Sequence, residues 1–279
     1  MSKVQSWEVS DAFWQRVEPL LPIQQRDPDK TYKRKPGGGR KRLDPRMAFS
    51  GIVYVLRTGC QWKAIPKEQF GCASAVHKYF IEWSKAGVFE AIWRQGLAEY
   101  DEMEGIAWEW QSIDGGMYKA PMALETVGKN PTDRGKKNGS KRHVLVDGRG
   151  VPLSIVVTGA NRHDVSQLEA VLDGVVFEKP AEQEQHLCAD CGYKGKQALS
   201  SILQRGYIPH VKQRKEEIED KKRDPSKKAR RWIVEASISW FNRFRKIHVR
   251  FEKLEVTHYG LTCLAAAIIT YRKIGVIYG

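Results

Sequence analysis

The sequence has no apolar run long enough to cross a membrane. Its longest apolar stretch, Leu261 to Tyr271, is far shorter than the roughly 20 residues that a spanning helix needs. The first residues, Met1-Ser2-Lys3-Val4-Gln5, lack the apolar segment of a secretory signal. We therefore expect a cytoplasmic protein with no membrane partner.

Cysteine is also scarce, with five residues in a chain of 279. Cys188 and Cys191 have C-x-x-C spacing, but a structural zinc site needs four ligands. The other cysteines offer no second pair at ligand spacing; they are Cys60, Cys72 and Cys263. We therefore expect small buried thiols.

Acidic residues are outnumbered by basic ones. The chain has 33 Asp and Glu against 47 Lys and Arg, a formal net charge of +14 and an isoelectric point near 9.5. A folded protein this basic favours a polyanionic partner, because neutralising phosphates releases counterions. Charge alone does not distinguish DNA, RNA and an acidic membrane. Hydrophobic residues make up 41% of the chain, enough for the core of one large or two ordinary domains.

The first 105 residues have the spacing of helices. Apolar residues recur at helical intervals in residues 13–21, 75–87 and 89–97, and in a segment that begins at Asp44 and Pro45 and ends at Gly59. Asp as N-cap, Pro in the first turn and Gly after the last turn are typical helix boundaries. We therefore predict an all-α domain over residues 1–105.

Two features of this half could contact DNA. Residues 33–42 form a run of Lys and Arg broken by Pro and Gly. Most charge runs are solvated loops, yet basic arms of this kind also reach into a minor groove or along phosphates, and we favour the arm. Residues 72–84, with His77 and Lys78 on the polar side, fit a recognition helix and an ordinary bundle helix equally well.

Beyond residue 105 the pattern changes to the alternation of strands, and helices follow. Residues 147–150 have the composition of a hairpin turn between two strands. The predicted order is β-β-β-α-β-α-β-α, a mixed five-stranded α/β domain over residues 106–279. Its strands are residues 106–114, 141–147, 151–158, 185–190 and 207–211, the three helices of this order begin near residues 164, 194 and 231, and a final apolar helix begins near residue 259.

Three acidic residues that are distant in the sequence occupy special places in this order. Asp114 and Asp190 end the first and fourth predicted strands, and Glu235 lies on the helix after the fifth. The carboxyl ends of strands line the functional crevice of an open sheet, so we expect the three carboxylates to converge, as in the ribonuclease-H-like fold. Converging carboxylates in a basic protein are what two-metal phosphodiester chemistry requires.

Two other aspartates compete for these roles. Asp147 fits the hairpin turn, and Asp164, the stronger competitor, fits a helix N-cap. His163 could orient a carboxylate or a water molecule, but a single His is more often structural. We therefore leave His163 out of the catalytic set.

The chain resembles the DDE transposases of bacterial insertion sequences, specifically the family numbered five, over nearly its whole length. Residues 44–46 and 53–66 are similar to that family's helical end-binding domain. The catalytic half is similar in four ordered blocks: Asp147-Gly148-Arg149-Gly150-Val151-Pro152-Leu153, Gly159-Ala160-Asn161-Arg162-His163-Asp164, Ala189-Asp190-Cys191-Gly192-Tyr193 and Trp232-Ile233-Val234-Glu235. The resemblance implies an N-terminal all-α, helix-turn-helix-like DNA-binding domain followed by an α/β ribonuclease-H-like catalytic domain.

The resemblance also implies an activity. Asp114, Asp190 and Glu235 match the family's catalytic positions and would hold two Mg²⁺ ions, which Mn²⁺ could replace. Such an enzyme binds the terminal inverted repeats of an insertion sequence, cleaves the DNA and transfers the freed 3′ end to target DNA. Because two ends must be joined, we expect a homodimer on double-stranded DNA, associated with the bacterial nucleoid.

Around the last acid, the wider family pattern has a Tyr, an Arg and a Lys at fixed spacing. Arg231 fits this pattern, whereas Lys228 and Asn242 stand in the places of the Tyr and the Lys. Arg243 or Lys246 could replace the missing Lys.

Basic segments at residues 134–142 and 212–231 would hold the DNA strands in place, because phosphate contacts position a protein on DNA. Together with the arm and the possible recognition helix, they give a set of predicted DNA-contacting residues. The set is Arg34, Arg40, Lys41, Arg42, His77, Lys78, Lys136, Lys137, Lys141, Arg142, Arg231, Arg243 and Lys246.

Two other functions remain open. A domesticated regulator would bind DNA specifically without catalysis, but an intact set of acids, whose mutual repulsion must be offset by metal, disfavours it. A plain nuclease of the ribonuclease-H-like fold is disfavoured by the separate N-terminal domain. Inverted repeats in the DNA that flanks the gene would distinguish a transposase from a regulator.

Overall fold

The computed structural model describes residues 5–23, 29, 31, 33, 35, 41–180, 183–211 and 230–277. The predicted DNA contacts Arg34 and Arg40 lie outside the described residues, as does almost all of the basic segment 212–231. In the part of the chain that the structure describes, no helix has the length and apolar character needed to span a membrane.

The first part of the chain is helical, as predicted. Its main helices are α1 (Asp11–Val17), α2 (Pro45–Thr58), α4 (Ala73–Lys85) and α5 (Val88–Glu104), and the short α3 (Lys67–Phe70) lies between α2 and α4. Short 3-10 turns, η1 (Glu18–Leu20) and η2 (Trp62–Ala64), follow α1 and α2.

The predicted boundaries of α2 are confirmed. The Asp44 carboxylate accepts a hydrogen bond from the Met47 N–H at 2.9 Å, so it is the N-cap. Gly59 ends the helix with φ of 73°, a left-handed conformation that glycine adopts without steric penalty.

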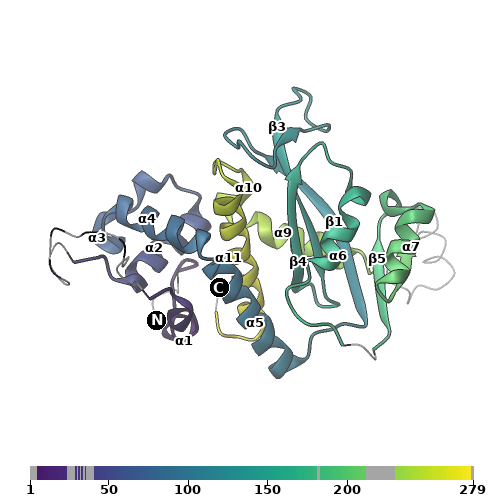
Figure 1. Ribbon diagram of the computed structural model, residues 1–279, viewed down its shortest axis with the longest axis horizontal. Coiled ribbons are helices and arrows are strands. Elements are labelled where there is room, and N and C mark those ends of the chain that lie inside the picture. The colour runs from purple at the N-terminus through teal and green to yellow at the C-terminus, as the bar shows by residue number, and fades with distance from the viewer. Residues whose placement is uncertain are drawn as a thin grey trace.

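The last helix, α11 (Glu255–Lys273), connects the two parts of the molecule. It packs along α5 and α4 on one side and contacts the strand β4 (Pro152–Gly159) on another, and Figure 1 shows α11 and α5 between the helical part and the sheet. The apolar stretch that contains Leu261 and Tyr271 is therefore core, and both residues are fully buried. The domain boundary near residue 105 stays a prediction, and a fragment ending there would leave one face of α5 uncovered.

The second part contains a mixed six-stranded sheet. β3 (Asn138–Val146) pairs antiparallel with β4, with the short β2 (Gly128–Lys129) and with β1 (Trp110–Lys119). β5 (Gln185–Ala189) pairs parallel with β1, and β6 (Tyr207–Val211) pairs parallel with β5. This is the predicted five-stranded arrangement plus β2, whose two residues are too few to give a periodic signal.

The prediction for the first strand was wrong at both ends. β1 starts at Trp110 rather than at residue 106, and it continues beyond Asp114 to Lys119. Gly115 and Gly116 hide this continuation, because glycine has low strand propensity. In the fold they pair with His143 and Arg142 of β3.

Helices cover both faces of the sheet. Neighbouring residues of a strand point to opposite faces. A Cβ at Gly115 would collide with Asp164 at the start of η3 (Asp164–Gln167), whereas a Cβ at Gly116 would lie 3.0 Å from Ile238 of α9 (Trp232–Asn242). One face therefore carries η3, and the other carries α9.

The remaining helices are short. α6 (Leu168–Asp173) follows η3, η4 (Cys191–Tyr193) follows β5, and α7 (Lys196–Gln204) packs on β6. The predicted helix near residues 231–246 is divided into α9 and α10 (Arg245–His248).

Asp147 belongs to the β3–β4 turn, as predicted. Its buried carboxylate accepts hydrogen bonds from the N–H groups of Arg149 and Val151 within the turn and from the Tyr100 hydroxyl of α5 at 2.9 Å. This aspartate therefore joins α5 to the sheet and has a structural role.

The cysteine prediction holds in part. Cys188 and Cys263 are buried and Cys60 is half-buried, but Cys72 and Cys191 are exposed. Cys72 is the N-cap residue of α4, and Cys191 is the first residue of η4.

Candidate active site

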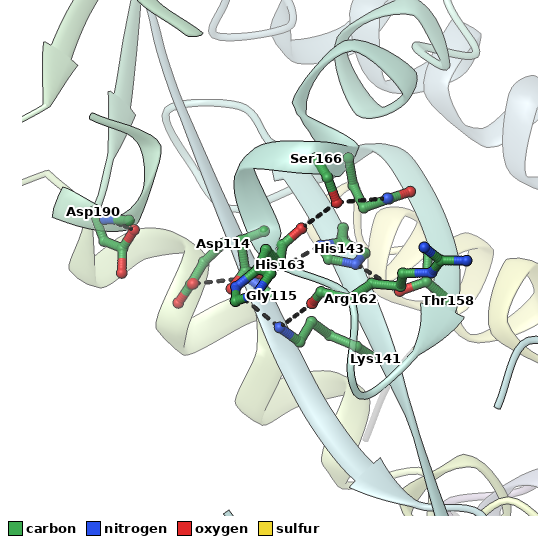
Figure 2. Close-up of polar contacts among 12 residues, drawn as sticks. Asp114, Gly115, Lys141, His143, Thr158, Arg162, His163, Ser166 and Asp190 are labelled. Atoms are coloured by element: carbon green, nitrogen blue, oxygen red, sulfur yellow. Dashed lines mark hydrogen bonds and ion pairs between the residues drawn. The ribbon is translucent and has the colours of Figure 1, made fainter. Parts of the chain in front are cut away.

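The parallel pairing of β1 and β5 brings two of the predicted catalytic acids together. Ser112 is in register with Cys188, so two residues further along the strands Asp114 lies next to Asp190, which directly follows β5. The Gly115 N–H donates to Asp114 Oδ1 at 2.7 Å, and the Gly192 N–H donates to Asp190 Oδ1 at 2.9 Å. Figure 2 shows these two carboxylates near each other. Backbone donors therefore orient both.

Glu235 lies over the same face of β1. The Ser112 hydroxyl donates to the Arg230 carbonyl at 3.3 Å, and Ile238 contacts Gly116, so α9 runs alongside the strand. Eight helical residues rise about 12 Å and four strand residues about 13 Å, which places Glu235 at the level of Asp114.

The Glu235 carboxylate itself points toward a cation. Its Oε1 lies 3.4 Å from the Arg231 guanidinium, one turn earlier, and 53% of its side chain is exposed. Among the described residues no group of three His, Cys, Asp or Glu is arranged to hold a metal ion. The structure therefore brings Asp114 and Asp190 together and leaves Glu235 nearby, paired with Arg231.

Asp164 does not have the predicted role of helix N-cap. His163 occupies the cap position and Asp164 is the first residue of η3. Its carboxylate contacts two side chains of β3, Lys141 Nζ at 3.1 Å and His143 Nδ1 at 3.3 Å. Burial alone would raise the pKa of Asp164, but hydrogen bonds from His143 and Lys141 lower it, so this acid is charged and compensated. In Figure 2, Lys141 and His143 lie to one side of Asp114 and Asp190 lies to the other.

Asp114 has the opposite electrostatic environment. Burial raises its pKa to about 6, and the negative charges of Asp190 and Asp164 add to the rise, while the Gly115 N–H and Arg231 act against it. Two carboxylates close together, neither of them in an ion pair within the described part of the chain, favour binding of a cation, because a cation relieves their repulsion. Carboxylate oxygens are also the ligands that Mg²⁺ prefers, so these side chains fit a divalent metal site.

Tyr193 is a member of the site that the sequence did not single out. Its ring is buried, with 1% exposed, and its hydroxyl has no hydrogen-bond partner among the described residues. Burial raises the pKa of Tyr193, and the charges of Asp164, Asp114 and Asp190 raise it further. The phenol therefore stays protonated, and its O–H is available to donate beside the acids. Its place three residues after Asp190 was the only signal in the sequence.

Several predicted DNA contacts face the interior. Arg142 is 2% exposed and lies between the rings of Tyr118 and Phe241, at 5.1 and 4.7 Å. Lys246 is 5% exposed, with Nζ 3.4 Å from the Glu252 carboxylate. Because both charges are buried, these two residues do not fit a role in contacting DNA.

Two further predictions also change. Lys141 is 6% exposed and holds Asp164, so its role is inside the site. His77 packs against Trp62 with ring centroids 4.9 Å apart, and burial lowers its pKa, so α4 does not present a charged His77 at its surface.

Other predicted DNA contacts are accessible. Arg42 is held against α4 by an ion pair of 2.7 Å with Glu82 and by the Tyr79 ring. The remaining described members of the set are at least partly exposed: Lys41, Lys78, Lys136, Lys137, Arg231 and Arg243. Lys136 and Lys137 precede β3 in the hairpin at the top of Figure 1.

Comparisons with known proteins agree with this architecture. A family model described as "Putative transposase of IS4/5 family" matches residues 9–93, and one described as "Transposase DDE domain" matches residues 111–269. A "Putative transposase for insertion sequence element IS402" from Burkholderia cepacia is 30% identical over 153 residues, which cover 53% of this chain and 70% of the relative. An IS402 uncharacterized 16.2 kDa protein from the same organism is 31% identical over 125 residues, 44% of this chain and 80% of the relative.

Two solved structures are weakly similar in shape. A pre-cleavage Mos1 transpososome is 9% identical with a TM-score of 0.27, over 84% of both chains. A mariner Mos1 paired end complex with Mg is 9% identical with a TM-score of 0.25, over 85% of both chains.

The match to the transposase domain is therefore the decisive comparison. Residues 111–269 are more than half of the 279-residue chain, and they contain Asp114, Asp190 and Glu235. Together with the helical part, the mixed sheet and the paired aspartates, this match shows that the chain belongs to the DDE transposases of insertion sequences, enzymes that bind and cleave DNA.

Proposed function

We propose that this transposase binds the terminal inverted repeats of an insertion sequence, cleaves the DNA and transfers the freed 3′ ends to target DNA. Asp114, Asp190 and Glu235 would be the metal ligands. The observation that carries this assignment is the register of β1 and β5, which sets Asp114 beside Asp190 under the helix that bears Glu235. Divalent metal use follows from membership of the DDE family, and the number of two ions is part of the proposal.

The chain's own groups prepare this site. When bound, two divalent ions would activate the attacking oxygen and stabilise the leaving oxygen of the phosphodiester. The N–H groups of Gly115 and Gly192 hold the two aspartates in place. Glu235 would leave Arg231 to complete the ligand set, which frees the Arg231 guanidinium for a DNA phosphate.

Tyr193 and Lys141 support the reacting groups without binding metal. The neutral Tyr193 hydroxyl, buried without a partner in the described protein, would keep a hydrogen-bond donor beside the acids. Lys141 neutralises Asp164, so the cations would bind to Asp114 and Asp190, which have no such ion pair among the described residues.

The exposed cations suggest how DNA reaches the site. Lys41 and Lys78 would contact the transposon end from the helical part, and Lys136 and Lys137 would contact it from the β2–β3 hairpin. All four are exposed, as phosphate contacts require. Two protomers on DNA would bring two ends together.

A cleavage assay on duplex DNA from the flanks of the gene tests the proposal. The wild type with Mg²⁺ should cut at the element's ends, whereas Asp114→Asn, Asp190→Asn and Glu235→Gln should bind this DNA without cutting it. Asp173→Asn is the matched control, because Asp173 is an exposed acid of the same half, paired with Arg205, and it should cut at the normal rate. Normal cutting by Asp190→Asn would overturn the assignment.

A further inference from the structure

Three arginines that are distant in the sequence meet where three helices end. Arg57 is in the last turn of α2, Arg243 is the C-cap residue of α9, and Arg272 is in the last turn of α11. Burial lowers the pKa of Arg272 to about 10, and the charges of Arg57 and Arg243 contribute. Burial and the charge of Arg243 also lower the pKa of Arg57. The three cations are therefore close enough to repel one another.

In the described part of the chain, the cluster has no acidic partner. Among the described residues, none of the three arginines forms an ion pair with a carboxylate. Arg57 Nη1 and Arg272 Nε and Nη2 are buried without a hydrogen-bond partner. The Arg57 guanidinium lies over the Phe244 ring, 4.8 Å from the ring centroid. The ring holds the guanidinium in place but accepts no hydrogen bond from its N–H groups, which point along the guanidinium plane. The cluster therefore has positive charge and several open N–H donors.

A structural role at the helix ends explains only part of this arrangement. A cation near a helix C-terminus is favoured by the helix dipole, which helps the fold to tolerate the charges. Residues with such a role donate hydrogen bonds to nearby carbonyl groups. Lys273, in the same last turn as Arg272, is an example, because it donates to the Arg149 carbonyl at 3.0 Å. The open N–H groups of Arg57 and Arg272 make no such bond within the described chain.

We propose that Arg57, Arg243 and Arg272 form a binding site for a backbone phosphate of DNA. The proposal rests on the proposed function insofar as DNA is the partner. A phosphate oxygen accepts two N–H groups from one guanidinium fork, and neighbouring forks can share one phosphate. A bound phosphodiester would both supply the missing acceptors and remove the repulsion among the three cations.

The position of the cluster suggests what the site contributes. Arg243 follows Glu235 by eight residues of α9, about 12 Å of helix, and one DNA strand presents a phosphate roughly every 3.4 Å of axis. The phosphate would thus lie about three or four nucleotides from the site of cleavage. Because Arg57 comes from the helical part and the other two from the C-terminal part, one phosphate would connect both parts to the same DNA.

Salt-dependent DNA binding by the full-length protein tests this site. A random-sequence duplex is titrated at several salt concentrations with wild type and with Arg57→Met, Arg243→Met and Arg272→Met. Each variant should lower the slope of log affinity against log salt by up to about 0.9, the value for the single phosphate that the cluster neutralises, and weaken binding at low salt by roughly tenfold. Arg94→Met is the matched control, because Arg94 is an exposed helical arginine paired with Glu90, and it should leave the slope unchanged.

Thermal unfolding without DNA provides a second readout. Removing a half-buried cation that has no ion pair among the described residues should leave the melting temperature of Arg272→Met equal to or above that of the wild type, whereas removing a stabilising interaction would lower it. Should Arg272→Met not fold, the exposed Arg243→Met carries the slope test.

The possible outcomes distinguish a failure of the phosphate site from a failure of the proposed function. A wild type that binds the duplex with variants of unchanged slope overturns the phosphate site and leaves the transposase assignment intact. Inorganic phosphate that stabilises the wild type but not Arg272→Met, with unchanged DNA slopes, would identify a free-anion site and likewise overturn the DNA assignment. A wild type with no salt-dependent duplex binding would instead overturn the DNA partner on which both proposals rest.

Discussion

The acidic site at the strand ends and the arginine cluster at the helix ends are two collections of like charge in one chain. In the first, Asp114 and Asp190 lie beside Asp164, whose charge is compensated by Lys141. In the second, Arg57, Arg243 and Arg272 lie together, and none of them forms an ion pair with an acid among the described residues. Each arrangement disfavours the folded protein on its own and is relieved by a ligand of opposite charge.

The two clusters differ in how they are built. Backbone N–H groups orient the aspartates, so the geometry of the acidic site is set by strand register. The arginines are placed by long side chains from three helices, and their donors stay open. The first design suits a small cation, which needs a fixed set of ligands, and the second suits a phosphate, which a planar guanidinium can bind in several orientations.

Removal of divalent metal should have the largest effect on DNA cleavage, and it should act on the acidic site alone. Chelation should abolish cleavage, Mg²⁺ or Mn²⁺ should restore it, and Ca²⁺ should support DNA binding without cleavage, because the carboxylates need a metal that also supports the chemistry. Cleavage and gel-shift assays on the same DNA measure both effects. Cleavage that persists in the presence of chelator would show that the acids are not a metal site, and the contrast between the acidic site and the arginine cluster would then be wrong.

Substitution of a single acidic residue should have the next-largest effect on the rate of cleavage. Asp114→Asn, Asp190→Asn and Glu235→Gln should each slow cleavage by more than the roughly 10–100-fold that losing an outer partner of a metal ligand causes, with end binding retained. Asp164→Asn should fall within that smaller range, because Asp164 is already paired with Lys141. Single-turnover cleavage rates decide the ranking. A dead Asp164→Asn beside a normal Asp190→Asn would reverse our assignment of the second acid.

The stability of the folded protein should depend on pH because Asp114 titrates. Its pKa in the folded protein, about 6, is above the ordinary value of 3.8, so the metal-free protein loses stability as pH rises through this interval. Asp114→Asn should therefore melt above the wild type at pH 8, by about 2–4 °C for each kcal/mol gained, and the difference should vanish below pH 4. Melting curves of both proteins in chelator measure it. A variant that melts lower at pH 8 would show that the Asp114 carboxylate stabilises the fold.

The basic arm should give the smallest effect. Replacing Arg40, Lys41 and Arg42 by Ala should flatten the log–log salt dependence of end binding by about 0.9 for each phosphate that is no longer neutralised. The total should be less than three phosphates, because Arg42 already pairs with Glu82. Gel shifts of the full-length protein at several salt concentrations measure the slope, with Arg94→Ala as control. An unchanged slope would assign the helical part to dimerisation or structure.

Local features were predictable from the sequence because neighbouring residues determine them. The N-cap Asp44, the left-handed Gly59 and the Asp147 turn behave as predicted. The first strand was misjudged because the two glycines after Asp114 obscure its pattern, although pairing with β3 extends it to Lys119. Asp164 was misjudged for a related reason: its partners, Lys141 and His143, come from another strand.

The net charge of the sequence indicated the kind of partner, but it did not indicate which basic residues are exposed to that partner. The balance of 47 basic against 33 acidic residues indicates a polyanion, yet burial decides which cations can meet it. Arg142 and Lys246 lie inside, at 2% and 5% exposure. The alternation of β3 turns Arg142 toward α9 while Lys141 points to Asp164 on the opposite face, and one residue of register would exchange them.

The amino-acid order by itself determined the helices and most of the strands, the family blocks and the three candidate acids, since propensities, caps and motifs act over a few residues. Only the tertiary structure decided that Asp114 lies beside Asp190, that Glu235 is paired with Arg231, that Tyr193 faces the acids and that Arg57 meets Arg243 and Arg272. These contacts join residues far apart in the chain, so they depend on strand register and helix packing, which the whole fold settles at once.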